Sequence, residues 1–231
     1  IIGGVVPVQT TTYYVKATSA DNCESEVQEI VLTVYPKPTL NSSLALTICS
    51  GDVFSYTATS AMSGVSFVWS RAAVSGISNP VRTNVNGPTI NETLINTTNA
   101  PVIIAYSIEM IANGCSKSET VYVTVNPKPG LSNDPGTITI CSGTAYTYLT
   151  PTSNVSSATI SWESLSVNGI AEGMANGTSS INEVLTNTTA NPVMVTYQFT
   201  LQADGCTNTQ TVSVMVNPSP ELSSALYLSP I

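Results

Sequence analysis

The chain is poor in charged residues and contains no histidine. Only 9% of its 231 residues are Asp, Glu, Lys or Arg, against about 25% in an ordinary globular domain. Its six basic residues are scattered, so they cannot form the basic stripe that a phosphate backbone requires, and we expect no nucleic-acid binding. Without histidine, a Ser-His-Asp triad, a Cys-His dyad and a histidine metal site are excluded.

Long apolar runs are also absent. No stretch approaches the 18 or so apolar residues of a transmembrane helix, so we expect no membrane insertion in this segment. Residues 1–7 lack the charged start and the cleavage site of a signal peptide. The chain is nevertheless 42% hydrophobic, too apolar for a disordered tail. Its solubility must come from Ser, Thr and Asn, which favours an extracellular protein.

Unrelated landmarks recur with one period. A Tyr precedes a Cys by nine residues at Cys23, Cys115 and Cys206, which are 92 and 91 residues apart. An Ile-Cys-Ser-Gly motif ends at Gly51 and at Gly143. A Pro-x-Pro motif occurs three times, at Pro36 and Pro38, Pro127 and Pro129, and Pro218 and Pro220. A shared period of 91 or 92 residues predicts tandem domains, since it is longer than the 20–50 residues of a solenoid unit.

The period divides the chain into four parts. Residues 1–38 are expected to be the C-terminal strands of a truncated repeat, 39–129 and 130–220 two complete repeats, and 221–231 the first strand of another. We therefore interpret the chain as a fragment of a longer protein. The Pro-x-Pro motifs are the inter-domain linkers, and they predict a semi-rigid string of domains because proline restricts φ.

Each repeat is predicted to be all-β. Residues 120–125 and 211–216 alternate apolar and polar side chains and are rich in β-branched residues. Asn113-Gly114 and Asp204-Gly205 are hairpin turn signals. No segment is a convincing amphipathic helix; residues 170–175 are the nearest. About seven short strands in 91 residues predict an immunoglobulin-like β-sandwich.

Five cysteines in a repeat framework indicate disulfides and an oxidising compartment. The simplest pairing lies within each repeat, Cys49 with Cys115 and Cys141 with Cys206, and leaves Cys23 unpaired. Two alternatives stay open: pairing of neighbours, Cys23 with Cys49 and Cys115 with Cys141, or buried free thiols. The within-repeat pairing has one geometric difficulty, because these cysteines could lie at opposite ends of a strand of about 26 Å, whereas bridged Cα atoms lie within about 7 Å.

Few residues suggest chemistry. Trp69 and Trp162 occupy equivalent positions and could stack on sugars, but a place in the core between two sheets is favoured. Glu92 and Glu183 recur after an Asn, yet no second carboxylate recurs beside them to complete a glycosidase pair. The cysteine spacing does not fit a zinc site, and Asp21, Asp52 and Asp204 are too isolated for calcium. We therefore expect no catalytic residue, no metal and no cofactor.

The motifs collected above resemble a known family. Ile48-Cys49-Ser50-Gly51, the Asn113-Gly114-Cys115 turn and the Asn-Pro-Lys-Pro linker at 126–129 resemble the PKD-like and immunoglobulin-like repeats of large Bacteroidetes surface proteins. Trp69-Ser70-Arg71 and residues 89–98 are most similar to gliding-motility adhesin repeats, whereas residues 160–176 are a diverged copy. The resemblance implies tandem sandwiches, type IX secretion, display at the cell surface in association with the outer membrane, and adhesion.

The sequence thus predicts a non-catalytic stalk or adhesive array of a bacterial surface adhesin. Its expected partners are neighbouring repeats of the same chain and surface polysaccharide or other cell-surface components. A carbohydrate-binding module, supported by a row of exposed aromatic residues, is the first alternative. Accessory β-domains of a secreted hydrolase are the second.

Overall fold

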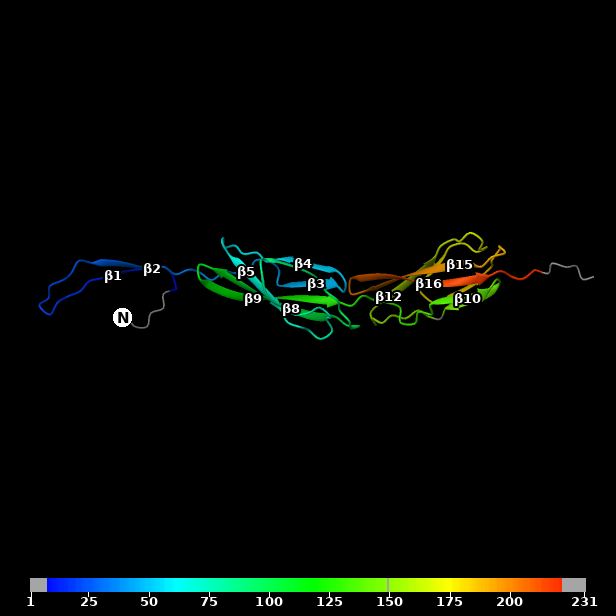
Figure 1. Cartoon of the computed structure of the whole chain (residues 1–231), viewed down its shortest axis with the longest axis horizontal. Coiled ribbons are helices and arrows are strands. Elements are labelled where there is room, and N and C mark those ends of the chain that lie inside the picture. The colour runs from blue at the N-terminus through cyan, green and yellow to red at the C-terminus, as the bar shows by residue number, and fades with distance from the viewer. Residues whose placement is uncertain (1–7, 149, 222–231) are drawn as a thin grey trace, which may run out of the picture.

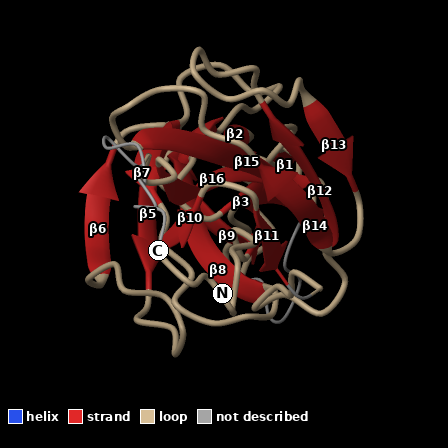
Figure 2. Ribbon diagram, turned by 90° about the vertical axis from the view of Figure 1, so that its right-hand side faces the viewer, coloured by secondary structure: helices blue, strands red, loops and turns tan. Residues whose placement is uncertain are grey.

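The computed structural model describes residues 8–148 and 150–221. The chain is extended, with a hairpin and two β-sheet domains following one another along the long axis (Figure 1). The described residues form strands, turns and loops but no helix, as the end-on view also shows (Figure 2). None of them could therefore form a membrane-spanning helix. The strand expected at 221–231 lies, beyond Glu221, outside the described residues.

The first domain contains seven strands in two sheets. Five strands form one sheet in the order β3-β9-β8-β5-β6, and β4 pairs with β7 in the other. Their bounds are β3 Ala45–Cys49, β4 Val53–Thr57, β5 Ser66–Arg71, β6 Arg82–Asn86, β7 Thr89–Thr93, β8 Val102–Ala112 and β9 Cys115–Asn126.

The second domain repeats this arrangement, with the sheet orders β10-β16-β15-β12-β13 and β11-β14. Its strands are β10 Thr137–Cys141, β11 Thr144–Tyr148, β12 Thr159–Ser164, β13 Ala175–Gly177, β14 Ile181–Leu185, β15 Val193–Ala203 and β16 Cys206–Asn217. The prediction of tandem β-sandwich domains is confirmed. Residues 170–175, the nearest approach to a helix in the sequence, form a bridge and bends instead.

Each domain is built around one long hairpin. In the first domain it joins β8 to β9 through Asn113 and Gly114, whose φ angles are +50° and +75°. Asp204 and Gly205 do the same between β15 and β16, with φ angles of +50° and +81°. Positive φ at both central residues matches the twist of the strands, so these dipeptides fix the hairpin register.

The first strand of each domain runs parallel to the last. Cys49 lies opposite Asn126 in the β3–β9 ladder, and Cys141 lies opposite Asn217 in the β10–β16 ladder. The Ile-Cys-Ser-Gly motif therefore lies at the end of the domain where the last strand leaves it. The hairpin cysteine, at the start of that strand, lies at the other end.

Alternating strand residues supply the two cores. In β8, for example, Ile104, Tyr106 and Ile108 are buried and their sequence neighbours are not. Trp69 and Trp162 are 5% and 8% exposed and lie in the cores of the two domains. Each packs edge-on against a tyrosine of the long hairpin, Tyr106 or Tyr197.

The N-terminal part of the described chain is a single hairpin. β1 (Thr11–Val15) pairs antiparallel with β2 (Gln28–Leu32), and within the described residues neither strand pairs with a third. The apolar side chains of β2 are exposed, Ile30 by 50% and Leu32 by 45%. In sequence, this segment shares the Tyr-to-Cys spacing of nine residues with the long hairpins of the two domains.

Candidate functional site: the junction between the domains

A disulfide joins the two domains. Cys49 at the end of β3 is bonded to Cys206 at the start of β16, and their Cα atoms are 5.6 Å apart. The bond connects positions 157 residues apart in the sequence. It can form because the exit end of the first domain faces the β15–β16 hairpin of the second.

The expected cysteine pairing is therefore wrong. Cys49 lies opposite Asn126, and Cys115 begins the same 12-residue strand, so the two cysteines are separated by about 37 Å of β9. Cys141 and Cys206 lie at opposite ends of β16 for the same reason. Neither pair can approach the roughly 7 Å that a disulfide requires. The alternative pairing of neighbours is also wrong, and Cys23, Cys115 and Cys141 carry free thiols.

Hydrogen bonds surround the disulfide and fix the junction. Asn126 Nδ2 donates to the Asp204 carbonyl of the facing hairpin at 2.7 Å. Asn208 Nδ2 donates to the Pro129 carbonyl at 2.8 Å, and the Leu131 amide donates to Gln210 Oε1 at 2.5 Å. The side chains of β16 thus bind the backbone of the linker that precedes their own domain.

The linker between the domains is packed rather than free. Pro127 and Pro129 are both buried, with the exposed Lys128 between them. The Gly130 amide donates to Asn154 Oδ1 at 2.7 Å, and Asn154 Nδ2 donates to Asn99 Oδ1 of the first domain at 3.0 Å. Proline rigidity, burial, hydrogen bonds and a covalent cross-link therefore all act on one junction.

The other two Pro-x-Pro motifs are more open. Pro36 is exposed and Pro38 is buried, whereas Pro218 is half-buried and Pro220 is exposed. At the junction that follows β2, the Cys115 thiol lies 3.7 Å from the Tyr35 carbonyl. Tyr35 is the counterpart of Asn126 one period earlier, so Cys115 occupies the position that Cys206 occupies at the cross-linked junction.

Glu92 forms a buried ion pair, a role that the sequence did not reveal. Arg71 Nε and Nη2 donate to the two oxygens of Glu92 at 3.0 and 3.1 Å, and the Tyr106 hydroxyl donates to Oε2 at 2.6 Å. Arg71 is 1% exposed, and its Nη2 also donates to the Pro80 carbonyl. Burial alone would raise the pKa of Glu92, but the bonds from Arg71 and Tyr106, with a longer one of 3.4 Å from the exposed Arg82, outweigh it and lower that pKa.

The second domain lacks this ion pair. Glu183 still accepts a hydrogen bond from the Tyr197 hydroxyl, but the counterpart of Arg71 is Ser164. Ser164 instead bonds the backbone of Ala175. Burial raises the pKa of Tyr197 above its ordinary value, and the hydrogen bond to Glu183 raises it further. A single glutamate that is bound to arginine or tyrosine stabilises a domain but cannot perform two-carboxylate chemistry.

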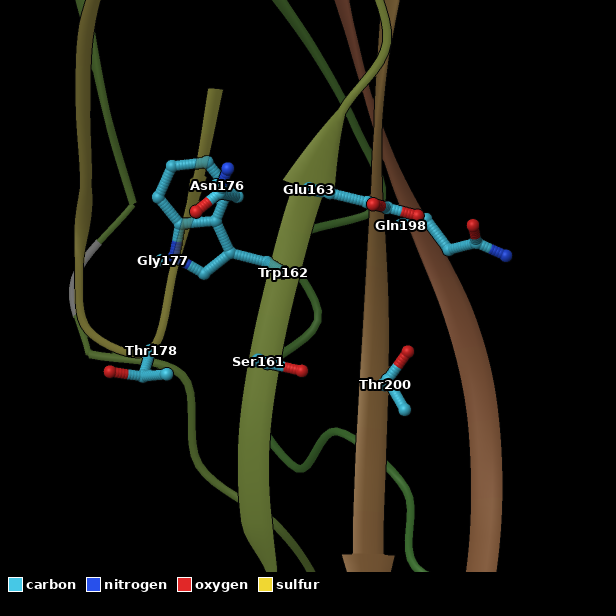
Figure 3. Close-up of a pocket in the computed structure, with 8 residues that line it drawn as sticks. All are labelled: Ser161, Trp162, Glu163, Asn176, Gly177, Thr178, Gln198 and Thr200. Carbon is cyan, nitrogen blue, oxygen red and sulfur yellow. The ribbon is translucent and has the colours of Figure 1, made fainter. Parts of the chain in front are cut away.

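Trp162 is among the residues that line a surface hollow, but only 8% of the residue is exposed. This hollow has a volume of about 320 Å³. The indole packs against Gly177, while Glu163, Gln198 and Thr200 point to the other side of the sheet (Figure 3). The indole Nε1 donates to the Ser179 carbonyl at 2.8 Å. Within residues 8–148 and 150–221, no three His, Cys, Asp or Glu side chains gather as metal ligands do.

Comparison with known families decides the relationship. The model of the PKD-like domain family matches residues 46–129 and 138–220. The chain belongs to the PKD-like domain family. The two matches coincide with the two sandwiches, so each sandwich is one PKD-like domain. A search of curated proteins found no match.

Solved structures with immunoglobulin domains in tandem are similar to the chain. The titin fragment I67–I69 is 13% identical, with a TM-score of 0.44, and the match covers 91% of this chain and 75% of that one. Extracellular domains 3–5 of Drosophila OTK are 10% identical, with a TM-score of 0.39 and coverage of 91% and 72%. The insect immune protein hemolin is 13% identical, with a TM-score of 0.39 and coverage of 90% and 56%.

Proposed function

We propose that this chain is a non-catalytic stalk segment of a large bacterial cell-surface adhesin, of the kind used in gliding motility. The observation that carries the proposal is the Cys49–Cys206 disulfide, which joins two domains end to end across a buried linker. A disulfide in immunoglobulin-like domains fits an extracellular protein. Type IX secretion and association with the outer membrane belong to the proposal.

The strand arrangement supports a mechanical role. When the disulfide is reduced, force enters a domain through its first strand and leaves through its last, and β3 and β9 are parallel neighbours joined over five residue pairs. Pulling them apart along their length loads all five pairs together, instead of opening them one at a time. The same holds for β10 and β16.

The disulfide shortens the covalent path that carries the force. Tension that reaches Cys49 passes through the bond to Cys206 and on along β16. The residues between the two cysteines, which are 157 positions apart, lie outside this path. At about 3.5 Å per extended residue, the bond withholds about 550 Å of chain from extension.

Single-molecule pulling tests this function. The chain is attached at residues 39 and 220 and stretched until it releases no further length. We expect the oxidised protein to release about 550 Å less length than the Cys49→Ser, Cys206→Ser double variant. Equal lengths would refute the mechanical role. The Cys141→Ser variant is the matched control, because Cys141 is exposed and forms no bond among the described residues.

The repeat boundaries form part of the same proposal. Residues 39–129 and 130–220 would be two units of an array, with 1–38 ending the unit before them and 221–231 beginning the unit after them. Neighbouring repeats are then the first partners of each domain, and surface polysaccharide is the proposed adhesion ligand. Trp69 and Trp162 are buried, so they give the carbohydrate-binding alternative no support, and no cluster in the described residues favours the hydrolase alternative.

A further inference from the structure

The hairpin β1–β2 has an uncovered face and an unused edge. Ile30 and Leu32 are 50% and 45% exposed, whereas their counterparts one period later, Val121 and Val123, are fully buried. Within the described residues, β2 pairs only with β1, so the backbone groups on its other edge have no strand partner. A single hairpin in water is marginally stable, and an exposed strand edge is a template for pairing.

In both domains, the edge equivalent to this one is paired with the first strand of the domain. β3 lies parallel to β9, and β10 lies parallel to β16, in the same register. Moved back by one period of 91 residues, the β3 register places Leu46 opposite Leu32, Ile48 opposite Val34 and Cys49 opposite Tyr35. A strand of this type would place its cysteine beside the Tyr35 carbonyl.

A second observation indicates the same occupant independently. Cys115 Sγ lies 3.7 Å from the Tyr35 carbonyl, where the incoming cysteine would lie. At the completed junction, Cys206 is the counterpart of Cys115, and it is bonded to the cysteine of β3. Asn126, the counterpart of Tyr35, is paired with that same cysteine in the β3–β9 ladder.

We propose that the free edge of β2 and the Cys115 thiol together form a docking site for one β3-type strand. The occupant is a strand of the pattern Ala-Leu-Thr-Ile-Cys-Ser-Gly from a further repeat, bound parallel to β2 and cross-linked to Cys115. Main-chain hydrogen bonds supply the affinity, and the side chains equivalent to Leu46 and Ile48 set the register. This inference rests on the proposed array of repeats but not on force transmission, so failure of the pulling experiment would leave it standing.

A synthetic peptide of residues 40–51 tests the site. Its cysteine is activated as a 2-thiopyridyl disulfide, so attack by the Cys115 thiolate forms the new disulfide and releases 2-thiopyridone. The protein retains its Cys49–Cys206 bond, and peptide mapping measures labelling at Cys23, Cys115 and Cys141. Each rate is divided by the rate with 2,2′-dithiodipyridine at the same thiol, which removes differences in intrinsic reactivity.

We expect the normalised rate at Cys115 to exceed those at Cys23 and Cys141 by at least about tenfold, the effect of about 1.4 kcal/mol of binding free energy. A peptide carrying Leu46→Ser and Ile48→Ser should lose the preference. The protein variant Leu32→Ser should lose it too, because it removes the apolar partner of Leu46. Both domains should stay folded in this variant, because Leu32 lies outside them.

Equal normalised rates at the three cysteines would overturn the proposal. So would a preference that survives both sets of serine substitutions, because the strand would then contribute nothing. A dimer of the intact chain that is linked Cys115 to Cys115, and forms faster than the peptide adduct, would show that the site binds something other than a β3-type strand and would also overturn it.

Discussion

Removal of the inter-domain disulfide should destabilise both domains at once. If the first domain unfolds while the second stays folded, the bond at Cys49 and the anchored linker at Pro129 close a loop. If the second domain unfolds alone, the loop runs from Asn126, beside Cys49, to Cys206. Each loop contains about 80 residues, and its closure stabilises the folded domain by about 4.5 kcal/mol in the chain-entropy estimate.

The effect is not additive over the two domains. When both unfold, a single loop of 157 residues remains, for which the same estimate gives about 5 kcal/mol. The first unfolding event is therefore opposed by about 4.5 kcal/mol and the second by only about 0.5 kcal/mol more. We expect the oxidised protein to unfold in one merged transition and the Cys49→Ser, Cys206→Ser variant to unfold in two.

One tryptophan in each core makes the two domains separately measurable. Urea denaturation is followed by fluorescence in a Trp162→Phe background, which reports the first domain, and in a Trp69→Phe background, which reports the second. The double cysteine variant and Cys141→Ser are compared with the parent in each background. A loss below about 1 kcal/mol, or a loss confined to one domain, would refute the loop reasoning.

Three further predictions concern the ion pair and the linker. In the Cys49→Ser, Cys206→Ser variant, in which the domains unfold separately, Arg71→Ala should cost the first domain about 3 kcal/mol, because only the exposed Arg82, 3.4 Å away, then remains beside the Glu92 carboxylate. Fluorescence in the Trp69→Phe background should show an unchanged second domain. The folded-state pKa of Glu92 is lowered, so the contribution of Glu92 to the stability of the first domain is complete above the unfolded pKa of about 4.3 and is lost as the pH falls through the folded value. Urea titrations below pH 4.3 should therefore show a free energy of unfolding that falls with pH, and Glu92→Gln should reduce this dependence. An unchanged dependence in Glu92→Gln would contradict the assignment. Replacement of Pro127 and Pro129 with Gly should shorten the particle in small-angle scattering after reduction but not in the oxidised state, and equal shortening in both states would show that the disulfide does not hold the junction.

Much of the fold could be predicted because it depends on local signals. The alternation in residues 120–125 identified part of β9, and the dipeptides at 113–114 and 204–205 identified the two long hairpins. The shared period then grouped these strands into equivalent domains. Short strands with weak patterns, such as β6 and β13, escaped notice because their bounds depend on pairing with β5 and β12 rather than on their own residues.

The cysteine connectivity could not be predicted from spacing. Every repeat carries the same two cysteine positions, so pairing within a repeat and pairing between repeats are equally consistent with the sequence. The choice depends on which ends of the domains meet, and that follows from the parallel placement of β3 beside β9. One signal against pairing within a repeat was available in the length of the last strand, because that strand separates Cys115 from Cys49 by the length of the domain.

The ion pair was missed for a different reason. Glu92 and Glu183 recur in the sequence, but the arginine partner occurs only in the first repeat, where Arg71 has Ser164 as its counterpart. A repeated residue with an unrepeated partner gives no periodic signal. Only the contact between β5 and β7 across the core reveals the pair.

The span of the Cys49–Cys206 bond also changes what a protease can do to this chain. A single cut of the backbone anywhere between the two cysteines leaves one fragment holding Cys49 and the other holding Cys206. The fragments stay covalently attached, and the sheets around the cut keep their remaining strands in register. A protein with this topology can be nicked across most of two domains without losing what lies beyond the nick, for as long as its surroundings remain oxidising.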